Sequence, residues 1–476
     1  MTAVATTGTA RRSSVALTAV VATAVALAFA DSSIVVLALP DLYATFDTTL
    51  VTVSWVVTAY NVTIAVAAFV LVPLAGRLRP VPVAASGFAV FAVASLVCGV
   101  APSFPVLVGA RGVQGVGGAL LLAASLPVLL GLTDHAPRAR STWALAGTLG
   151  AAIGPALGGV LTELLSWRSI FLLQAPVAVA ALAVLAVPAV RRAAHDVPGR
   201  LTGREIVANV GEVLLFAALV GALFLAVLLV IVVWRYSPIQ GALAVSTLPV
   251  AALVARPLPR HLPGSLCAVA GGFLLGGGLL ALALLPDASA AYLAAALAAC
   301  GGGLALLGGL LGAAAVPPGA GLMRPATFTI GARHLGFVVG LVAIAPLLAA
   351  DLEQATLDAT RASAQVILDG RVGLRTKVPL VLDLRNDILD TPRGRVPDLT
   401  AAFEENGVDG DRQLTAVRND LVAAIEDTIT RAFRPSFLLA ALFGAAASLP
   451  ALIVAGWRRE DEHAPPARAV RKETGP

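Results

Sequence analysis

Apolar runs long enough to cross a lipid bilayer recur along almost the whole chain. A membrane-spanning helix needs about 20 mainly apolar residues. Runs of this kind lie at residues 15–39, 53–76, 81–101, 105–131, 141–164, 169–190, 206–234, 239–258, 265–285, 290–316, 332–350 and 435–457. With 58% hydrophobic and 13% charged residues, the 476-residue chain has too little polar surface to cover a soluble globule. The sequence therefore predicts an all-α membrane protein with 12 transmembrane helices.

The arginines of the loops predict which side of the membrane each loop faces, because cytoplasmic loops carry an excess of Lys and Arg. Alternate loops hold 12 arginines, whereas the five short loops between them hold only Arg168 and Arg235. We therefore expect both termini in the cytoplasm. The 12 are Arg77, Arg79, Arg138, Arg140, Arg191, Arg192, Arg200, Arg204, Arg256, Arg260, Arg324 and Arg333.

The first run also imitates a secretory signal peptide, with Ala28 to Ala30 as its cleavage site. Because the apolar residues continue to Leu39, we expect this segment to be retained as a span. Only Lys377 and Lys472 are lysines, and Ala, Gly and Pro are abundant, which is typical of a high-GC bacterial genome. The expected location is thus a bacterial plasma membrane.

Two polar stretches divide the chain. Residues 191–205 form a predicted cytoplasmic linker between an N-terminal six-helix half (1–190) and spans seven to eleven (206–350). Residues 351–433 precede the last span (434–457), which a cytoplasmic tail (458–476) follows.

The stretch 351–433 carries 15 Asp and Glu against 10 Lys and Arg. Long outer segments escape the positive-inside count, so its arginines do not oppose the predicted topology. Apolar residues recur at helical spacing within 412–432, and residues 351–369 are expected to extend the eleventh span outward. We expect a small, mainly helical extracytoplasmic cap, which offers a possible site for a protein partner.

One carboxylate, Asp31, lies inside the first apolar run. A charge at bilayer depth costs roughly 3 kcal/mol or more and is usually functional, paired or protonated. Asp31 lies roughly 14 Å from the outer end of its span, and Arg111 roughly 9 Å from the outer end of the fourth. Two interpretations stay open. The pair is either a fixed structural ion pair or a proton-dependent switch, in which protonation of Asp31 frees Arg111 and changes the favoured conformation.

Small residues cluster in the fifth run. Glycines four apart allow close helix contact, and a proline releases a backbone hydrogen bond. The pattern predicts either close packing alone or a hinge or seal between conformations. The residues are Gly147, Gly150, Gly154, Pro155, Gly158 and Gly159.

These motifs resemble the major facilitator superfamily, and specifically its drug:proton antiporter branch, which usually has 14 spans. Asp31 to Pro40 resembles the first-span signature of that branch, and Arg111 to Ala119 resembles its fourth-span R-x-x-Q-G-x-G motif. Gly154 to Gly159 resembles its antiporter motif. Trp55 and Tyr60 resemble its second-span aromatic pair, and the resemblance is strongest from about residue 15 to residue 180.

The resemblance implies a major facilitator fold, in which two six-helix halves rock around a central cavity that binds substrate near the midplane. It also implies that Asp31 carries the proton and that Arg111 couples it. The chain departs from the branch in three places. The two extra central spans are missing, and the loop from Gly76 to Pro80 lacks the aspartate that forms the usual cytoplasmic charge latch. The outer stretch 351–433 is also far larger than the corresponding loop usually is.

Few other polar groups are expected in the membrane. Tyr60, Asn61, Gln114 and Gln174 are candidates to line the substrate cavity, although a packed interior explains each of them equally well. We place Glu212 near the inner end of span seven, which leaves the second half without a mid-membrane carboxylate. This scarcity of polar groups predicts a hydrophobic or amphipathic substrate. The histidines are assigned to cytoplasmic loops or the tail, so no metal site or cofactor is expected: His135, His195, His261, His334 and His463.

The sequence thus predicts a secondary transporter, not an enzyme, that exports hydrophobic or amphipathic compounds in exchange for protons. Its expected partners are the substrate, protons and membrane lipids. Nucleic acid is not expected, because the basic residues are spread over short loops. Two alternatives stay open. One is a lipid or glycolipid exporter that hands cargo over through the cap, and the other is a scaffold that no longer transports and docks a partner through residues 351–433.

Overall fold

The computed structural model consists of helices and loops throughout the residues it describes, which are 2–133, 135–188, 190, 199–285, 289–318, 321–369, 415, 419 and 426–463. The first half contains α1 (Thr2–Ile34), η1 (Val35–Ala38), α2 (Leu39–Thr45), α3 (Leu50–Val53), α4 (Trp55–Leu71), α5 (Pro80–Gly99), α6 (Phe104–Thr133), α7 (Ala136–Leu164) and α8 (Trp167–Leu185). The second half contains α10 (Gly203–Leu228), η2 (Leu229–Val233), α11 (Pro238–Val245), α12 (Thr247–Ala255), η3 (Leu258–Arg260), α13 (Gly264–Ala283), α14 (Ala290–Ala315), α15 (Met323–Asp369), α19 (Arg434–Ala446) and α20 (Ser448–His463).

The predicted number of spans is confirmed. Eleven segments of the described chain are long and apolar enough to cross a membrane, and the bent helix α7 makes a twelfth. Its parts, Ala136–Gly150 and Ile153–Leu164, meet at 42°. Pro155 explains the bend, because it cannot donate a backbone hydrogen bond to the carbonyl four residues earlier, at the break between the two parts.

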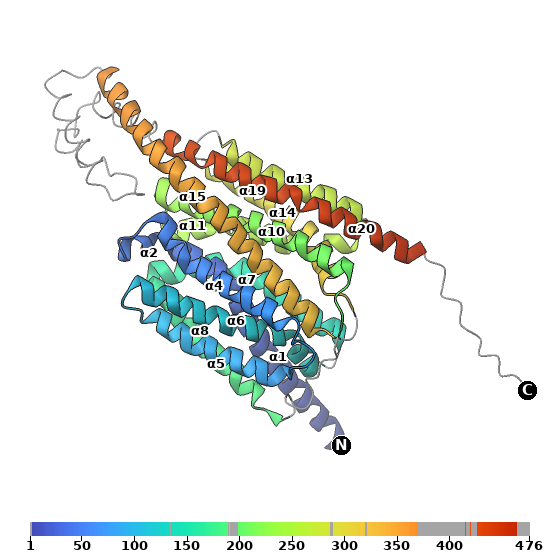
Figure 1. Ribbon diagram of the computed structural model, residues 1–476. Helices are drawn as coiled ribbons and strands as arrows, with labels where there is room; N and C mark the ends of the chain where they lie inside the picture. The colour runs from blue at the N-terminus through green and yellow to red at the C-terminus, as the bar shows by residue number, and fades with distance from the viewer. Residues whose placement is uncertain are drawn as a thin grey trace, which may run out of the picture.

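The helices run along one common direction, with the two halves side by side (Figure 1). The start of α1 and the end of α20 lie at the same end of the bundle, which we name the termini end; the opposite end is the far end (Figure 1). Helix α15 continues to Asp369, past the part that can cross a membrane, which ends at Ala355. The helical extension predicted for 351–369 is therefore present. Residues 191–198 of the predicted linker, and nearly all of 370–425 in the predicted cap, lie outside the described residues.

The halves meet along two seams. Helix α15 packs on α4 and α6 at one seam, and α7 packs on α11 and α12 at the other. Both contacts rely on glycine. A Cβ on Gly331 would lie 3.0 Å from the ring of Phe69, and a Cβ on Gly159 would lie 2.5 Å from the carbonyl oxygen of Pro238. Glycine therefore admits the Phe69 ring against the backbone of α15 at one seam and brings the backbones of α7 and α11 together at the other.

Helix α10 begins earlier than the apolar run indicates. Thr202 and Glu205 form a capping box around its first turn, so the helix begins at Gly203. Glu212 consequently lies about 14 Å inside the helix. The prediction that this carboxylate sits near the helix end was wrong.

Helix α15 also begins early, at Met323 instead of residue 332. A proline is tolerated in the first turn of a helix, so Pro325 does not delay the start. His334 then lies about 17 Å inside the helix. Its ring is 3% exposed, so its assignment to a cytoplasmic loop was wrong.

Candidate functional site

Asp31 and Arg111 form a buried ion pair in the first half. Arg111 Nη1 lies 2.5 Å from Asp31 Oδ2, and both side chains are 0% exposed. The carboxylate comes from α1 and the guanidinium from α6. The two charges that the sequence places at similar depth are therefore in direct contact, which lowers the cost of burying each.

The glycines that follow Arg111 allow this contact, because they bring α6 against two neighbouring helices. A Cβ on Gly115 would lie 2.5 Å from the carbonyl oxygen of Tyr60 in α4. A Cβ on Gly117 would lie 2.6 Å from the backbone nitrogen of Phe91 in α5. The R-x-x-Q-G-x-G pattern thus sets the position of the helix as well as its charge.

Two glutamines close a ring of hydrogen bonds around the ion pair. Gln174 Nε2 donates to Asp31 Oδ1 at 2.7 Å, and Gln114 Nε2 donates to Gln174 Oε1 at 2.6 Å. Arg111 Nη1 donates to Gln114 Oε1 at 2.7 Å. The ring joins α1, α6 and α8, so a change in the charge of Asp31 acts on all three helices.

Arg111 is also bound to α4. Its Nε donates to the carbonyl oxygen of Val56 at 2.8 Å, and its guanidinium carbon lies 4.2 Å from the ring centre of Tyr60. Its Nη2 has no hydrogen-bond acceptor among the described residues. Carbonyl and ring contacts would continue to hold the arginine if Asp31 lost its charge.

A second polar group, centred on Asn61, spans the two halves. Asn61 Oδ1 accepts from Ser32 Oγ at 3.0 Å and lies 2.6 Å from Nδ1 of His334 on α15. The rings of Tyr60 and His334 meet edge to face, with centroids 6.1 Å apart. The sequence did carry a signal for this placement, because residues 325–332 hold no charged side chain and allow the span to start earlier.

The second half has its own buried ion pair. Arg333 Nε and Nη2 lie 3.1 and 3.2 Å from the carboxylate oxygens of Glu212, which is 0% exposed. The guanidinium carbon lies 5.2 Å from the ring centre of Phe216 and 5.9 Å from that of Trp143 on α7. The second half therefore buries a paired carboxylate of its own, which the sequence did not indicate.

The motif glycines of α7 have different partners. Added Cβ atoms on Gly154 and Gly158 would meet Ser33 Oγ and the Ile34 carbonyl oxygen, both in α1 of the same half. A Cβ on Gly159 would instead meet α11 of the other half. Pro155, which lies between Gly154 and Gly158, bends the helix. Of the motif glycines, only Gly159 lies on the seam between halves.

A family model described as Major Facilitator Superfamily matches residues 21–350, more than half of the chain. The match covers the Asp31 and Arg111 site and both seams between the halves. This chain belongs to the Major Facilitator Superfamily.

Several curated proteins resemble this facilitator-superfamily chain. The methylenomycin A resistance protein of Streptomyces coelicolor is 31% identical over 242 residues, which are 49% of this chain and 48% of the relative. The multidrug resistance protein Stp of Mycobacterium tuberculosis is 37% identical over 154 residues, 31% of this chain and 28% of the relative. The cephamycin export protein CmcT of Amycolatopsis lactamdurans is 38% identical over 211 residues, 40% of this chain and 42% of the relative. The chain thus aligns with less than half the length of each relative.

The fold also matches solved facilitator-superfamily structures. A bacterial homolog of the human lysosomal transporter Spinster, in an inward-facing and occupied conformation, superposes with a TM-score of 0.61. The match covers 94% of this chain and 98% of the other at 16% sequence identity. This likeness establishes the two-half architecture.

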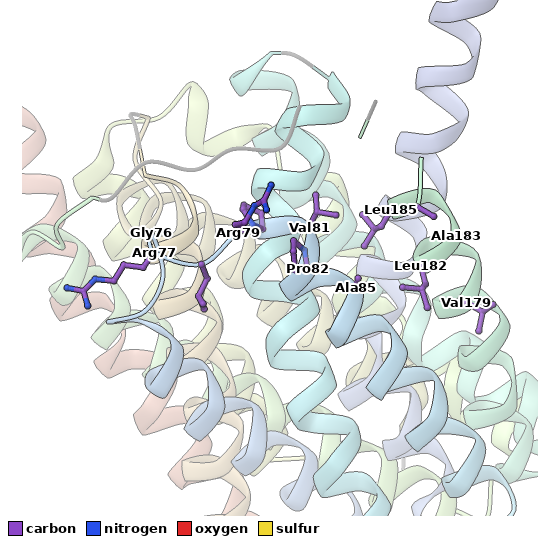
Figure 2. A pocket seen from close by; sticks show the side chains of 13 residues that line it. Gly76, Arg77, Arg79, Val81, Pro82, Ala85, Val179, Leu182, Ala183 and Leu185 are labelled. Atoms are coloured by element: carbon purple, nitrogen blue, oxygen red, sulfur yellow. The ribbon is translucent and has the colours of Figure 1, made fainter. Parts of the chain in front are cut away.

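Outside the buried network, the described residues contain no group of three or more His, Cys, Asp or Glu that could hold a metal ion. A groove of about 690 Å³ lies at the termini end, between the ends of α5 and α8 (Figure 2). Arg77 and Arg79 lie beside apolar residues there, at the loop that lacks the family aspartate. The groove is separate from the buried network around Asp31.

Proposed function

We propose that this protein is a secondary transporter that exports hydrophobic or amphipathic small molecules in exchange for protons. The observation that carries the proposal is the buried pair of Asp31 and Arg111, held in a ring of hydrogen bonds within a two-half bundle. The relatives named for multidrug resistance and for cephamycin export support a drug-like substrate.

Protonation of Asp31 is the proposed coupling step. It removes the charge that attracts Arg111, while the Val56 carbonyl and the Tyr60 ring retain the arginine on α4. Protonation of Asp31 therefore changes which relative positions of α1, α4 and α6 are favoured. A ligand shifts a conformational equilibrium only by its differential affinity for the two states, and a proton on Asp31 meets this requirement.

Transport in everted vesicles tests the proposal. Ethidium, a lipophilic cation, and a neutral hydrophobic dye serve as probes, with proton release from the vesicle lumen as readout. Asp31→Asn is expected to abolish substrate-induced proton release, because the neutral amide cannot carry the proton. Glu353→Gln, which alters an exposed carboxylate on α15, is the matched control and should behave like the wild type. Proton release that survives Asp31→Asn would remove Asp31 from the mechanism.

We further propose a bacterial plasma membrane as the location, with both termini cytoplasmic. The distribution of arginines and the position of the start of α1 and the end of α20 at one end of the bundle support this orientation. In the same everted vesicles, added protease should cleave a tag at the carboxyl terminus. A protected tag would reverse the orientation.

A further inference from the structure

His334 is a polar side chain of the second half that is held by the first half. It lies on α15 with 3% of its surface exposed, and its Nδ1 is 2.6 Å from Asn61 Oδ1 on α4. Among the described residues this is its only side-chain hydrogen bond. The α4–α15 seam is one of the two places where the halves meet, so this contact has to change if the halves separate along α4.

The partners of Asn61 fix the proton on the imidazole. Asn61 Nδ2 donates to the carbonyl oxygen of Val57 at 2.8 Å, and a carbonyl can only accept. The amide oxygen therefore faces Ser32 and His334, and the ring must supply the hydrogen. A neutral imidazole with its proton on Nδ1 satisfies the contact, so no positive charge is required on His334.

Charged groups around the ring occur in compensated pairs. Arg333 precedes His334 on α15 and is paired with Glu212 of α10. From α4 the ring meets Tyr60 and Asn61, and from α1 Ser32 reaches Asn61 directly after Asp31, which is paired with Arg111. A protonated ring would add an uncompensated charge between these pairs.

We infer that His334 is a neutral hydrogen-bond donor that latches α15 to α4 and transmits the state of Asp31 to the second half. The inference rests on the proposed function for the identity of the coupling carboxylate. Two contact routes link the sites. Ser32, next to Asp31, shares the Asn61 oxygen with His334, and Arg111 lies over the Tyr60 ring, whose edge meets the imidazole.

Two substitutions separate a donor from a titrating group. His334→Asn places an amide nitrogen at the position of Nδ1 and keeps the donor, although it cannot titrate near neutral pH. His334→Leu is similar in volume and has no donor. Asn61→Ala removes the acceptor from the other side of the same hydrogen bond.

Distances between spin labels report the conformation without any substrate. Leu74→Cys with Leu258→Cys spans the halves at the termini end, and all four positions used for labels are exposed. Leu165→Cys with Leu284→Cys spans the far end. The native cysteines, which are buried, are replaced by alanine: Cys98, Cys267 and Cys300.

The two label pairs give the ratio of molecules whose halves are apart at the termini end to molecules whose halves are apart at the far end. His334→Leu should change this ratio about 5-fold, the usual effect of one lost hydrogen bond. It should also make the ratio independent of pH. His334→Asn should stay within about 2-fold of the wild type and keep the pH dependence. Asn61→Ala should match His334→Leu, and combining the two should add no further change. Because His334→Leu and Asn61→Ala remove the same hydrogen bond from its two sides, either variant tests the inference if the other folds poorly.

Two results would overturn the latch. Loss of the pH dependence in His334→Asn as well would show that the ring itself is the titrating group. Wild-type behaviour in His334→Leu would show that the side chain only fills space. Failure to export any probe would reject the proposed function alone, because the label distances require no transport. Retained pH dependence in Asp31→Asn would reject Asp31 as the source of the signal but leave the distances for His334 measurable.

Discussion

At the scale of single residues, each buried charge of the Asp31 and Arg111 pair is compensated by its partners. Arg111 contacts one carboxylate, one amide oxygen, one backbone carbonyl and an aromatic face. Removing one member of such a buried pair costs far more than the pair contributes, because it leaves the other charge unpaired. A carboxylate in this position is sensitive to its partners, which suits a group that must change its protonation state.

Arg111→Met is therefore expected to lower the free energy of unfolding by about 3–5 kcal/mol at neutral pH. Asp31→Asn combined with Arg111→Met should be less destabilised than Arg111→Met alone, because no unpaired charge remains. Thermal unfolding in detergent measures both losses.

Arg431→Met is the matched control. Arg431 and Asp427 form an ion pair whose side chains are 65% and 52% exposed. Its loss should cost less than about 1 kcal/mol. Equal losses at Arg111 and Arg431 would contradict the account of the buried pair.

At the scale of secondary-structure elements, α7 is the helix that glycine positions most closely. Its glycines meet α1 along one face and α11 at the far end, and its two parts differ in direction by 42°. The sequence left open whether the glycines serve packing or conformational change. Their packing partners differ: Gly154 and Gly158 fix α7 on α1 within one half, and Gly159 meets α11 of the other half.

Gly158→Ala and Gly147→Ala form a matched pair in α7. The new Cβ at 158 would meet the Ile34 carbonyl oxygen, whereas that at 147 would lie 3.6 Å from the ring of Phe29, an ordinary contact. Alanine otherwise favours a helix by up to about 1 kcal/mol over glycine. Gly147→Ala should thus be neutral or stabilising, and Gly158→Ala should lower both the melting temperature and transport. Equal melting temperatures would show that α1 and α7 are not tightly packed here.

At the scale of the whole molecule, each end has its own seal between the halves. At the termini end Arg324 of α15 donates to the carbonyl oxygens of Val72 and Pro73, which follow α4, at 3.1 and 3.2 Å. At the far end Glu163 of α7 accepts from the backbone nitrogen of Ile239 in α11 at 2.7 Å. Arg324 thus holds the loop region in which the family aspartate is missing.

Arg324→Met and Gly159→Ala should shift the conformational equilibrium in opposite directions. The first removes donors at the termini end and should increase separation there. The second places a Cβ 2.5 Å from both the Pro238 oxygen and the Ala242 Cβ, so it should increase separation at the far end. The label pairs at positions 74 and 258 and at 165 and 284 measure the two changes. A shift in the same direction for both variants would contradict the assignment of one seal to each end.

Sequence alone predicted the number of spans, the family and the depth of the first-half site. These follow from the length of apolar runs and the fixed rise of a helix, so Asp31 and Arg111 could be placed together without a structure. Boundaries were predicted less well. Both α10 and α15 extend beyond their predicted spans. A capping box starts α10 in a polar segment, and α15 starts early because its first turn tolerates Pro325 and residues 325–332 carry no charge.

Only the tertiary structure decided which side chains meet across helices. Rotation of α15 about its axis brings His334 to Asn61 and Arg333 to Glu212, and the packing of α7 assigns Gly158 to α1 and Gly159 to α11. The hydrophobic pattern of a membrane span says little about which face points to the protein, because lipid and protein interiors are equally apolar. The packing of small residues sets the contacts instead. The sequence therefore placed Asp31 and Arg111 at similar depth, and the packing of the helices determined which side chains meet.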